Sequence, residues 1–308
     1  MIDPEVPALE PISSRWSGAP MAPANATDSR TGRTGAALRQ LARNRMALIG
    51  LIVLLVAVLA AIAAPLIAPY SPNKIAVIDA LQAPSRAHLM GTDNLGRDLF
   101  SRILYGIRMS ILIATVSIAV AATVGVTLGL LSGYYGKRVD EVIMRLMDIL
   151  YAFPDLLLAL ALIATFGTGL PSLIAAIAIG RIPGFARITR ASVLAVRENE
   201  YVEAARTIGM GNGRILVRHI LPNGIAPIIV MTSVSLALAI LVEASLSFLG
   251  LGIQPPTPSL GGLLKDSIGF METAPWMAIF PGITIALIIF ALNLLGDGLR
   301  DVLDPKLK

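Results

Sequence analysis

The chain contains no cysteine and only two histidines among its 308 residues. The missing thiols exclude disulfides, thiol chemistry and any Cys-based metal or cluster site. Two lone imidazoles, His88 and His219, are too few for a histidine-rich metal site and do not suggest a Ser/His/Asp constellation. We therefore expect no metal, no cofactor and no covalent catalysis in this chain.

A phosphate-binding loop is also missing. Such a loop needs the pattern G-x-x-x-x-G-K-[ST], in which backbone N–H groups surround the phosphates and the Lys reaches the terminal groups. The nearest candidate, residues 136–138, has Leu131 where the first Gly should stand and an Arg after the Lys. The Gly-rich stretches at Gly209 and Gly250 lack the third Gly of a dinucleotide fingerprint. The chain itself is therefore not expected to bind or hydrolyse ATP.

Charge is scarce, because charged residues make up only 15% of the chain, against about 25% in a typical soluble domain. Hydrophobic residues make up 55%, and they come in blocks long enough to span a bilayer. The sequence therefore predicts an all-α, multi-pass membrane protein with six transmembrane helices. The net charge of +5 fits the Lys and Arg that membrane proteins collect on cytoplasmic loops, so we expect no nucleic-acid partner.

Composition divides the chain into five segments. The first is rich in Pro, Ala, Ser and Thr and is expected to be a disordered tail, and the second is a retained helix with a basic flank rather than a signal peptide. The third is an external loop with an amphipathic helix, the fourth is a core with five more spans, and the last is a polar tail. The segments comprise residues 1–38, 39–68, 69–109, 110–298 and 299–308.

Six apolar runs are expected to be the spans, and the second carries small residues every three or four positions, which favours close helix packing in lipid. Pro154 interrupts the third run, and the Gly- and Pro-rich segment 250–275 is expected to be re-entrant or interfacial. The runs cover residues 46–67, 110–133, 142–166, 170–196, 223–249 and 276–295.

An even number of spans puts both termini on one side of the membrane. If that side is the cytoplasm, 19 of the 25 Lys and Arg residues fall inside and six outside, as the positive-inside rule requires. We therefore expect a lipid-embedded protein of the plasma or inner membrane with both termini in the cytoplasm. Residues 91–108 are open in this assignment, because an amphipathic helix suits either face of the membrane.

Three acidic residues in the spans are candidates for a pathway or gate, because ionisable groups in lipid face a cavity, a partner helix or the interface. Asp148 lies three residues after Arg145, so the two are expected to pair on one helix face. They either orient the third span or help to form a gate. Asp155 follows Pro154 and either shapes a kink or lines the pathway. Glu243 is the deepest lone acid, and it either binds a cationic group in transit or hydrogen-bonds a neighbouring helix.

A charged helical hairpin at residues 197–222 lies between the fourth and fifth spans. Asn199 is expected to cap its first helix, and Gly209 suits a left-handed stop for that helix. Asn212 is expected to cap a second helix that Pro222 ends. The hairpin is either a solvated connector or a docking element for a soluble partner.

The hairpin resembles the EAA loop of ABC-importer permeases, whose pattern is Glu-Ala-Ala, three residues, Gly, nine residues, then Ile-x-Leu-Pro. The matching positions are Glu203-Ala204-Ala205, Gly209 and Leu221-Pro222. His219 departs from the Ile position, as it does in the peptide-permease branch, where the ending reads H-I-L-P-N. Segments at 91–110, 245–264 and the C-terminus are similar to the C-type permease of dipeptide and oligopeptide importers, so the likeness covers roughly residues 40–308.

This resemblance implies a type I ABC-importer permease fold and a coupling role for the hairpin. The coupling residues by position are Tyr201, Glu203, Ala204, Ala205, Arg206, Gly209 and Arg214. It also implies a heterodimer with a homologous second permease, two ATPase subunits that bind ATP and Mg, and an extracytoplasmic substrate-binding protein. The substrate stays open between peptides and a nickel chelate, glutathione, haem or an antimicrobial peptide. A stand-alone secondary carrier or channel is the alternative function, and a non-transporting membrane scaffold is a third.

Overall fold

The structure is a computed structural model that describes residues 44–303. Over this range the protein is helical, with only an isolated β-bridge between Thr92 and Asp98. The predicted disordered tail at 1–38 lies outside the described residues. The predicted polar tail at 299–308 is described only to residue 303, and up to there it is helical. These residues continue the last long helix, and the predicted domain boundary at residue 299 stays a prediction.

Five described helices are long and apolar enough to cross a membrane: α2 (Arg45–Ile67), α3 (Leu99–Tyr135), α6 (Leu170–Val196), α9 (Ile225–Phe248) and α11 (Trp276–Leu303). A sixth crossing is formed if α4 (Lys137–Tyr151) and α5 (Asp155–Phe166) count together as one broken span. Large apolar side chains remain exposed on these helices, such as Ile62, which is 69% exposed on α2. Such side chains suit a lipid environment, which supports the predicted six spans.

Helix α3 corrects one expected boundary. The sequence predicts an amphipathic helix that ends near residue 108 and a separate span from residue 110. The structure instead joins them into one helix of 37 residues. No helix-breaking residue stands between the two parts, and Asp98 caps the start by accepting a hydrogen bond from the Ser101 backbone N–H. The helix ends before Gly136, whose φ of +61° turns the chain into α4.

The predicted third span is broken rather than merely interrupted. Helices α4 and α5 meet at an angle of 89° around Pro154, which lacks an N–H and cannot continue the helix. Helix α4 has a charged face, so only α5 is apolar all round. The bend therefore separates the charged half of the segment from its apolar half.

Helix α10 (Leu260–Ser267) and the short 3-10 helix η4 (Ile268–Phe270) occupy the predicted re-entrant or interfacial segment. Ser259 caps α10 through its side chain, and Leu260 and Leu263 are buried. Helix α10 packs against α9 and α11. A Cβ on Gly261 would lie 2.2 Å from the Ala244 carbonyl oxygen, so the α10 backbone lies directly on α9. Whether this segment enters the membrane stays a prediction.

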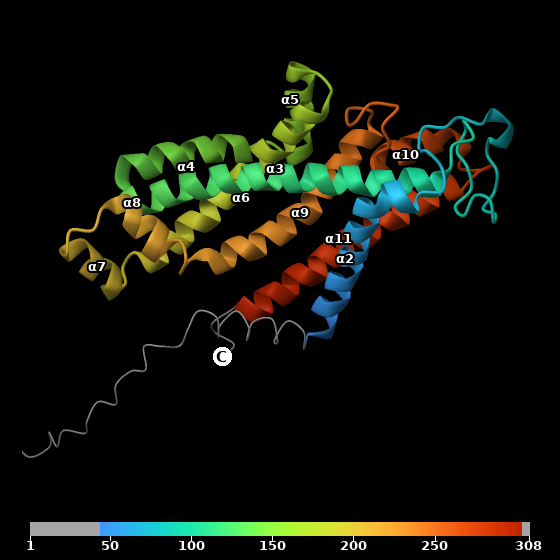
Figure 1. The fold of residues 1–308 in the computed structure, drawn as a ribbon. Helices are drawn as coiled ribbons and strands as arrows, with labels where there is room; N and C mark the ends of the chain where they lie inside the picture. The colour runs from blue at the N-terminus through green and yellow to red at the C-terminus, as the bar shows by residue number, and fades with distance from the viewer. Residues whose placement is uncertain (1–43, 304–308) are drawn as a thin grey trace, which may run out of the picture.

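The long helices α3 and α6 run side by side and form the axis of the molecule. Figure 1 shows the hairpin helices α7 and α8 at one end of α3, and the loop before α3 at the other. We call these the hairpin end and the loop end. Helices α2 and α11 pack on each other, and the Asn44 side-chain amide donates a hydrogen bond to the Asp301 carboxylate (3.2 Å), which holds the start of α2 beside the end of α11.

Candidate functional site

The hairpin has the two-part form that the sequence predicts. Helix α7 (Glu200–Thr207) is followed by the single turn α8 (Asn212–Ile215) and the π-helix η3 (Leu216–Ile220). Gly209 has a φ of +77°, which confirms the predicted left-handed stop, because a side chain disfavours this conformation. No atom lies within 4 Å of the position that a Cβ would take on Gly209, so the residue is required for its backbone angle and not for space.

The two predicted asparagine caps were wrong. Asn199 stands at the N-cap of α7, but its side chain makes no hydrogen bond to the helix backbone. Asn212 lies inside α8, whose N-cap is Gly211. The Asn212 side chain instead accepts a hydrogen bond from the Tyr134 hydroxyl of α3 (2.9 Å). The second helix begins one residue earlier than the sequence predicts. The Asn212 side chain is therefore directed to α3 and links the hairpin to that helix.

The hairpin has a small hydrophobic core of its own. Val202 and Ala205 of α7 are buried against Ile215, Leu216 and Ile220 from the second half of the hairpin. Val193 near the end of α6 belongs to the same cluster, with the α3 residues Leu130 and Tyr134 packed against it. The hairpin is therefore continuous with two of the long helices and is not a loosely attached loop.

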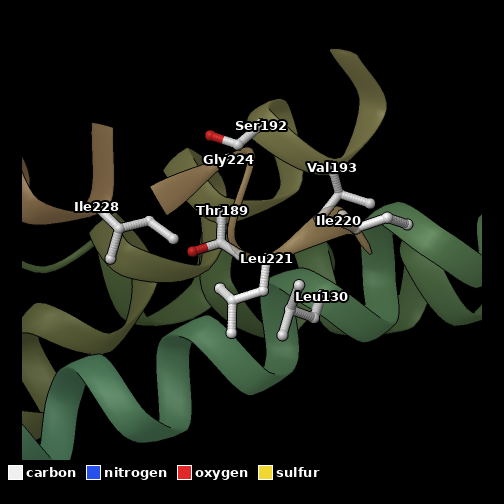
Figure 2. A pocket seen from close by; sticks show the side chains of 8 residues that line it. All are labelled: Leu130, Thr189, Ser192, Val193, Ile220, Leu221, Gly224 and Ile228. Atoms are coloured by element: carbon white, nitrogen blue, oxygen red, sulfur yellow. The ribbon is translucent and has the colours of Figure 1, made fainter. Parts of the chain in front are cut away.

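A second contact joins the hairpin to α9. Figure 2 shows Ile220 and Leu221 from the end of the hairpin beside Leu130 of α3 and Thr189 of α6, with Ile228 of α9 facing them. Gly224 lies against α6, since a Cβ there would be 3.1 Å from the Ser192 Cβ. A displacement of the hairpin would thus be transmitted to α3, α6 and α9 at this joint.

The outer face of the hairpin is exposed. It brings together most of the residues singled out from the sequence, namely Tyr201, Glu203, Ala204, Arg206, Gly209 and Arg214. Ile208 joins them with 77% of its surface exposed, although no sequence pattern singles it out. Ile208 adds an apolar contact to a face that is otherwise charged and polar. The Arg206 guanidinium lies over the Tyr134 ring at 5.2 Å, a cation–π contact that orients it.

Ala205 differs from the other members of the motif. The resemblance implies a coupling role for both alanines of the Glu-Ala-Ala pattern, but the Ala205 side chain is buried inside the hairpin core. Consecutive residues on a helix point about 100° apart, so Ala204 and Ala205 cannot share one narrow face. The structure leaves Ala204 at the surface and gives Ala205 an internal packing position.

Three ion pairs join α6 to the broken span, and we call them the α6 ion-pair row. They are Asp140–Arg190 (2.6 Å), Asp148–Arg187 (2.7 Å) and Asp155–Arg181 (2.5 Å). Arg187 also lies over the Tyr151 ring at 4.4 Å. The sequence showed acids on one segment and arginines on another but gave no sign of the pairing, which depends on how α4 and α5 fold back onto α6. Asp148 and Asp155, two of the candidate pathway residues, both lie in this row.

The expected pair between Arg145 and Asp148 was wrong. The Asp148 carboxylate is turned toward Arg187, 39 residues further along the chain, while Arg145 lies 3.5 Å from Glu141. A neighbour at i+3 on the same helix competes poorly with an arginine presented by a packed helix, because an exposed local pair contributes little. Asp155 follows the bend at Pro154 and is held there by Arg181.

Glu243, the third candidate, lies between helices in the core. Its side chain is fully buried and accepts hydrogen bonds from the Ser110 hydroxyl of α3 (2.7 Å) and the Ser247 hydroxyl of α9 (2.8 Å). This confirms the alternative in which the carboxyl group hydrogen-bonds a neighbouring helix. Both oxygens have a partner, so the group links α3 to α9. A role in the pathway stays a prediction.

The Asp140–Arg190 pair offers a stability test. We expect Arg190→Gln to lower the thermal midpoint of the detergent-solubilised protein by a few degrees, because it leaves the Asp140 carboxylate without its two 2.6 Å hydrogen bonds from Arg190. In a double-mutant cycle with Asp140→Asn, the coupling is expected to be about 1–2 kcal/mol. Arg145→Gln is the matched control, since that side chain is 76% exposed and its loss should change little. Additive single effects would contradict the pairing.

The comparisons with known proteins agree with this geometry. Residues 125–308 match the family described as binding-protein-dependent transport system inner membrane component. Residues 33–84 match the N-terminal TM domain of oligopeptide transport permease C. The dipeptide transport system permease protein DppC of Alkalihalophilus pseudofirmus is 46% identical over 88% of this chain and 90% of that protein. The glutathione transport system permease protein GsiD of Pectobacterium atrosepticum is 45% identical, again over 88% and 90%.

Solved structures show the same fold at low sequence identity. The inward-facing MetNI methionine ABC transporter aligns with a TM-score of 0.55 at 16% identity, over 66% of this chain and 97% of that chain. A second crystal form aligns with a TM-score of 0.51 at 18% identity, over 64% and 96%. The chain therefore belongs to the family of binding-protein-dependent transport system inner membrane components. It is a membrane-spanning permease subunit of an ABC transporter with the type I importer fold.

Proposed function

We propose that this chain forms half of the translocation pathway of an ATP-driven importer for dipeptides and oligopeptides. The observation that carries the proposal is the set of relatives that are 45–46% identical over 88% of the chain. They are named as transporting dipeptides, di/tripeptides and glutathione. All three are short peptides or peptide-like molecules, so a peptide is the substrate class that they share.

The hairpin is the element through which ATP hydrolysis drives the permease. Its outer face presents the charged side chains of Glu203 and Arg206 beside the apolar Ile208. Its inner face is fixed to α3, α6 and α9. A soluble ATPase that binds the outer face can therefore move three spans at once. This arrangement is what a two-state membrane protein needs if a remote nucleotide is to bias its equilibrium.

The remaining partners follow from this assignment. Two ATPase subunits bind ATP and Mg, a homologous second permease completes the pathway, and an extracytoplasmic binding protein delivers the peptide. This chain needs no cofactor and is not catalytic. The distribution of Lys and Arg along the sequence supports a multi-pass orientation with both termini and the hairpin in the cytoplasm.

Reconstitution of the complete complex tests the proposal. Proteoliposomes that contain both permeases, both ATPases and the binding protein are expected to accumulate di- and tripeptides only when ATP is supplied on the hairpin side. A peptide panel scored by stimulated ATP hydrolysis then defines the preferred length. Peptide uptake by this chain alone under an ion gradient would overturn the proposal in favour of a secondary carrier.

A further inference from the structure

A cavity of about 240 Å³ lies at the loop end, on the far side of the molecule from the hairpin. The start of α3 and the segment that precedes it form one wall, and the loop after α9 together with α10 forms the other. We call it the loop-end pocket. Its polar lining includes Asn94, Arg97, Arg102, Gln254, Lys265 and Asp266. None of these residues belongs to the hairpin or to the α6 ion-pair row.

The Asp93 carboxylate, which lies behind this pocket, already accepts three hydrogen bonds. Asp93 accepts hydrogen bonds from the backbone N–H groups of Leu95 and Arg97 through one oxygen, at 2.9 Å each. Its other oxygen accepts the Arg97 Nε–H at 2.6 Å. Arg102 Nε lies 3.5 Å from the same oxygen and is buried without a hydrogen-bond partner among residues 44–303. Asp93 therefore holds Arg97 in place but leaves Arg102 Nε without a hydrogen bond in the described chain. Arg102 Nη1 does donate one, to the Pro72 carbonyl (3.2 Å).

Asp266 compensates part of the positive charge of Arg97 and Arg102 but makes no close hydrogen bond with either. Its carboxylate lies 3.7 Å from Arg97 Nη2 and 3.9 Å from Arg102 Nη2, beyond the range of a good hydrogen bond. Lys265 adds a third positive charge at the rim, and within the described part of the chain it has no ion-pair partner. Three cationic and two anionic side chains leave the pocket with an excess of one positive charge.

The Lys265 ammonium group lies beside Gly250, at the rim of the loop-end pocket. Gly250 has a φ of +84°, and a Cβ on it would lie 2.5 Å from the Lys265 ammonium nitrogen. The Lys265 ammonium group therefore lies directly against the backbone of the loop after α9. The Arg97 and Arg102 side chains are only 9% and 5% exposed, so a ligand must enter the pocket to reach them. A small planar anion can enter the pocket. A carboxylate is such an anion, and its two oxygens match the paired N–H donors of a guanidinium group.

We propose that the loop-end pocket binds a carboxylate group of the peptide under transport. Arg102 and Arg97 hold it from within and Lys265 from the rim. The proposal rests on the proposed function, in which the pocket lies on the side where the binding protein releases its peptide. A buried guanidinium N–H without a hydrogen bond is costly, and a carboxylate offers Arg102 Nε the short hydrogen bond that Asp93 and Asp266 do not supply. Asp266 competes with the ligand for the same two arginines.

The experiment uses the complete complex in proteoliposomes and the peptide-loaded binding protein as the titrant. Lys265→Gln is expected to lower kcat/KM for stimulated transport about fivefold, the factor that one partly exposed charge pair contributes. Lys265→Arg should retain it. Asp266→Asn is expected to raise kcat/KM by a similar factor, because it removes the competing carboxylate. A merely structural role of Asp266 would instead lower activity, which would overturn the proposal.

A second measurement identifies the source of the carboxylate. Empty binding protein is titrated onto the same complexes in nanodiscs, and its Kd is expected to be equal for wild type, Lys265→Gln and Asp266→Asn. A parallel change in this Kd would show that the pocket takes an acidic side chain of the binding protein, and the proposal would fail. If the wild type transports no peptide, the proposed function fails. If the wild type transports and all three variants equal it, only the pocket assignment fails.

Discussion

A permease with Glu203→Arg is expected to fold normally and to lose ATP-driven transport almost completely. Glu203 is exposed on α7 and has no ion-pair partner in the described residues 44–303, so the change should alter the stability of the isolated chain by less than about 0.5 kcal/mol. At the proposed interface with the ATPase it replaces a carboxylate by a cation. Such a reversal costs about 2–5 kcal/mol of binding, which is a loss of at least about thirtyfold in affinity.

Co-purification of the ATPase with the tagged permease measures the first effect, and peptide uptake in proteoliposomes measures the second. Glu198→Arg is the matched control, because it makes the same charge change in the exposed residues just before α7. Its only ion-pair contact in the described chain is with the adjacent Arg197 at 3.4 Å. We expect the control to retain both assembly and uptake. If Glu203→Arg retains them as well, the hairpin is not the docking element.

The spans and the hairpin could be predicted from the sequence because each has a strong local signal. Helix α6 has the same bounds in the structure, Leu170–Val196, as in the prediction. The left-handed stop at Gly209 could also be predicted, since few other residues tolerate the required φ. Apolar blocks of spanning length and a helix-stopping glycine depend on neighbouring residues alone, so no tertiary information is needed to find them.

The features that failed depend on residues far apart in the chain. Asp148 has a plausible partner three residues away, yet it pairs with Arg187 because α4 packs against α6. The predicted Asn212 cap failed for a related reason, since Asn212 accepts a hydrogen bond from Tyr134 of α3 through its side chain. The loop-end pocket has no local signature either, because its arginines and its lysine come from segments about 165 residues apart. A sequence pattern identifies charged residues but not the helices that they meet.

The stripe of small residues on α3 carries the second large prediction. Gly129→Leu is expected to prevent the accumulation of folded protein, because it separates α3 from α6. A Cβ on Gly129 would lie 2.4 Å from the Ala186 carbonyl oxygen and 2.7 Å from the Thr189 Cβ. Backbone atoms cannot rotate away as a side chain can, so the helices must move apart. Overpacking alone costs about 1–3 kcal/mol, and the lost contacts along the rest of α3 and α6 add to it.

Size-exclusion chromatography of a fluorescent fusion in detergent measures the outcome as the fraction of monodisperse protein. Val124→Leu is the control, because Val124 lies on the same helix and faces outward, where lipid accommodates an added methylene. Gly129→Ala should lie between the two, since its single methyl group already meets the carbonyl. A monodisperse Gly129→Leu protein would mean that α3 and α6 can separate without unfolding. The hairpin would then be attached to helices that slide, and the joint in Figure 2 could not carry a displacement to α3 and α6 together.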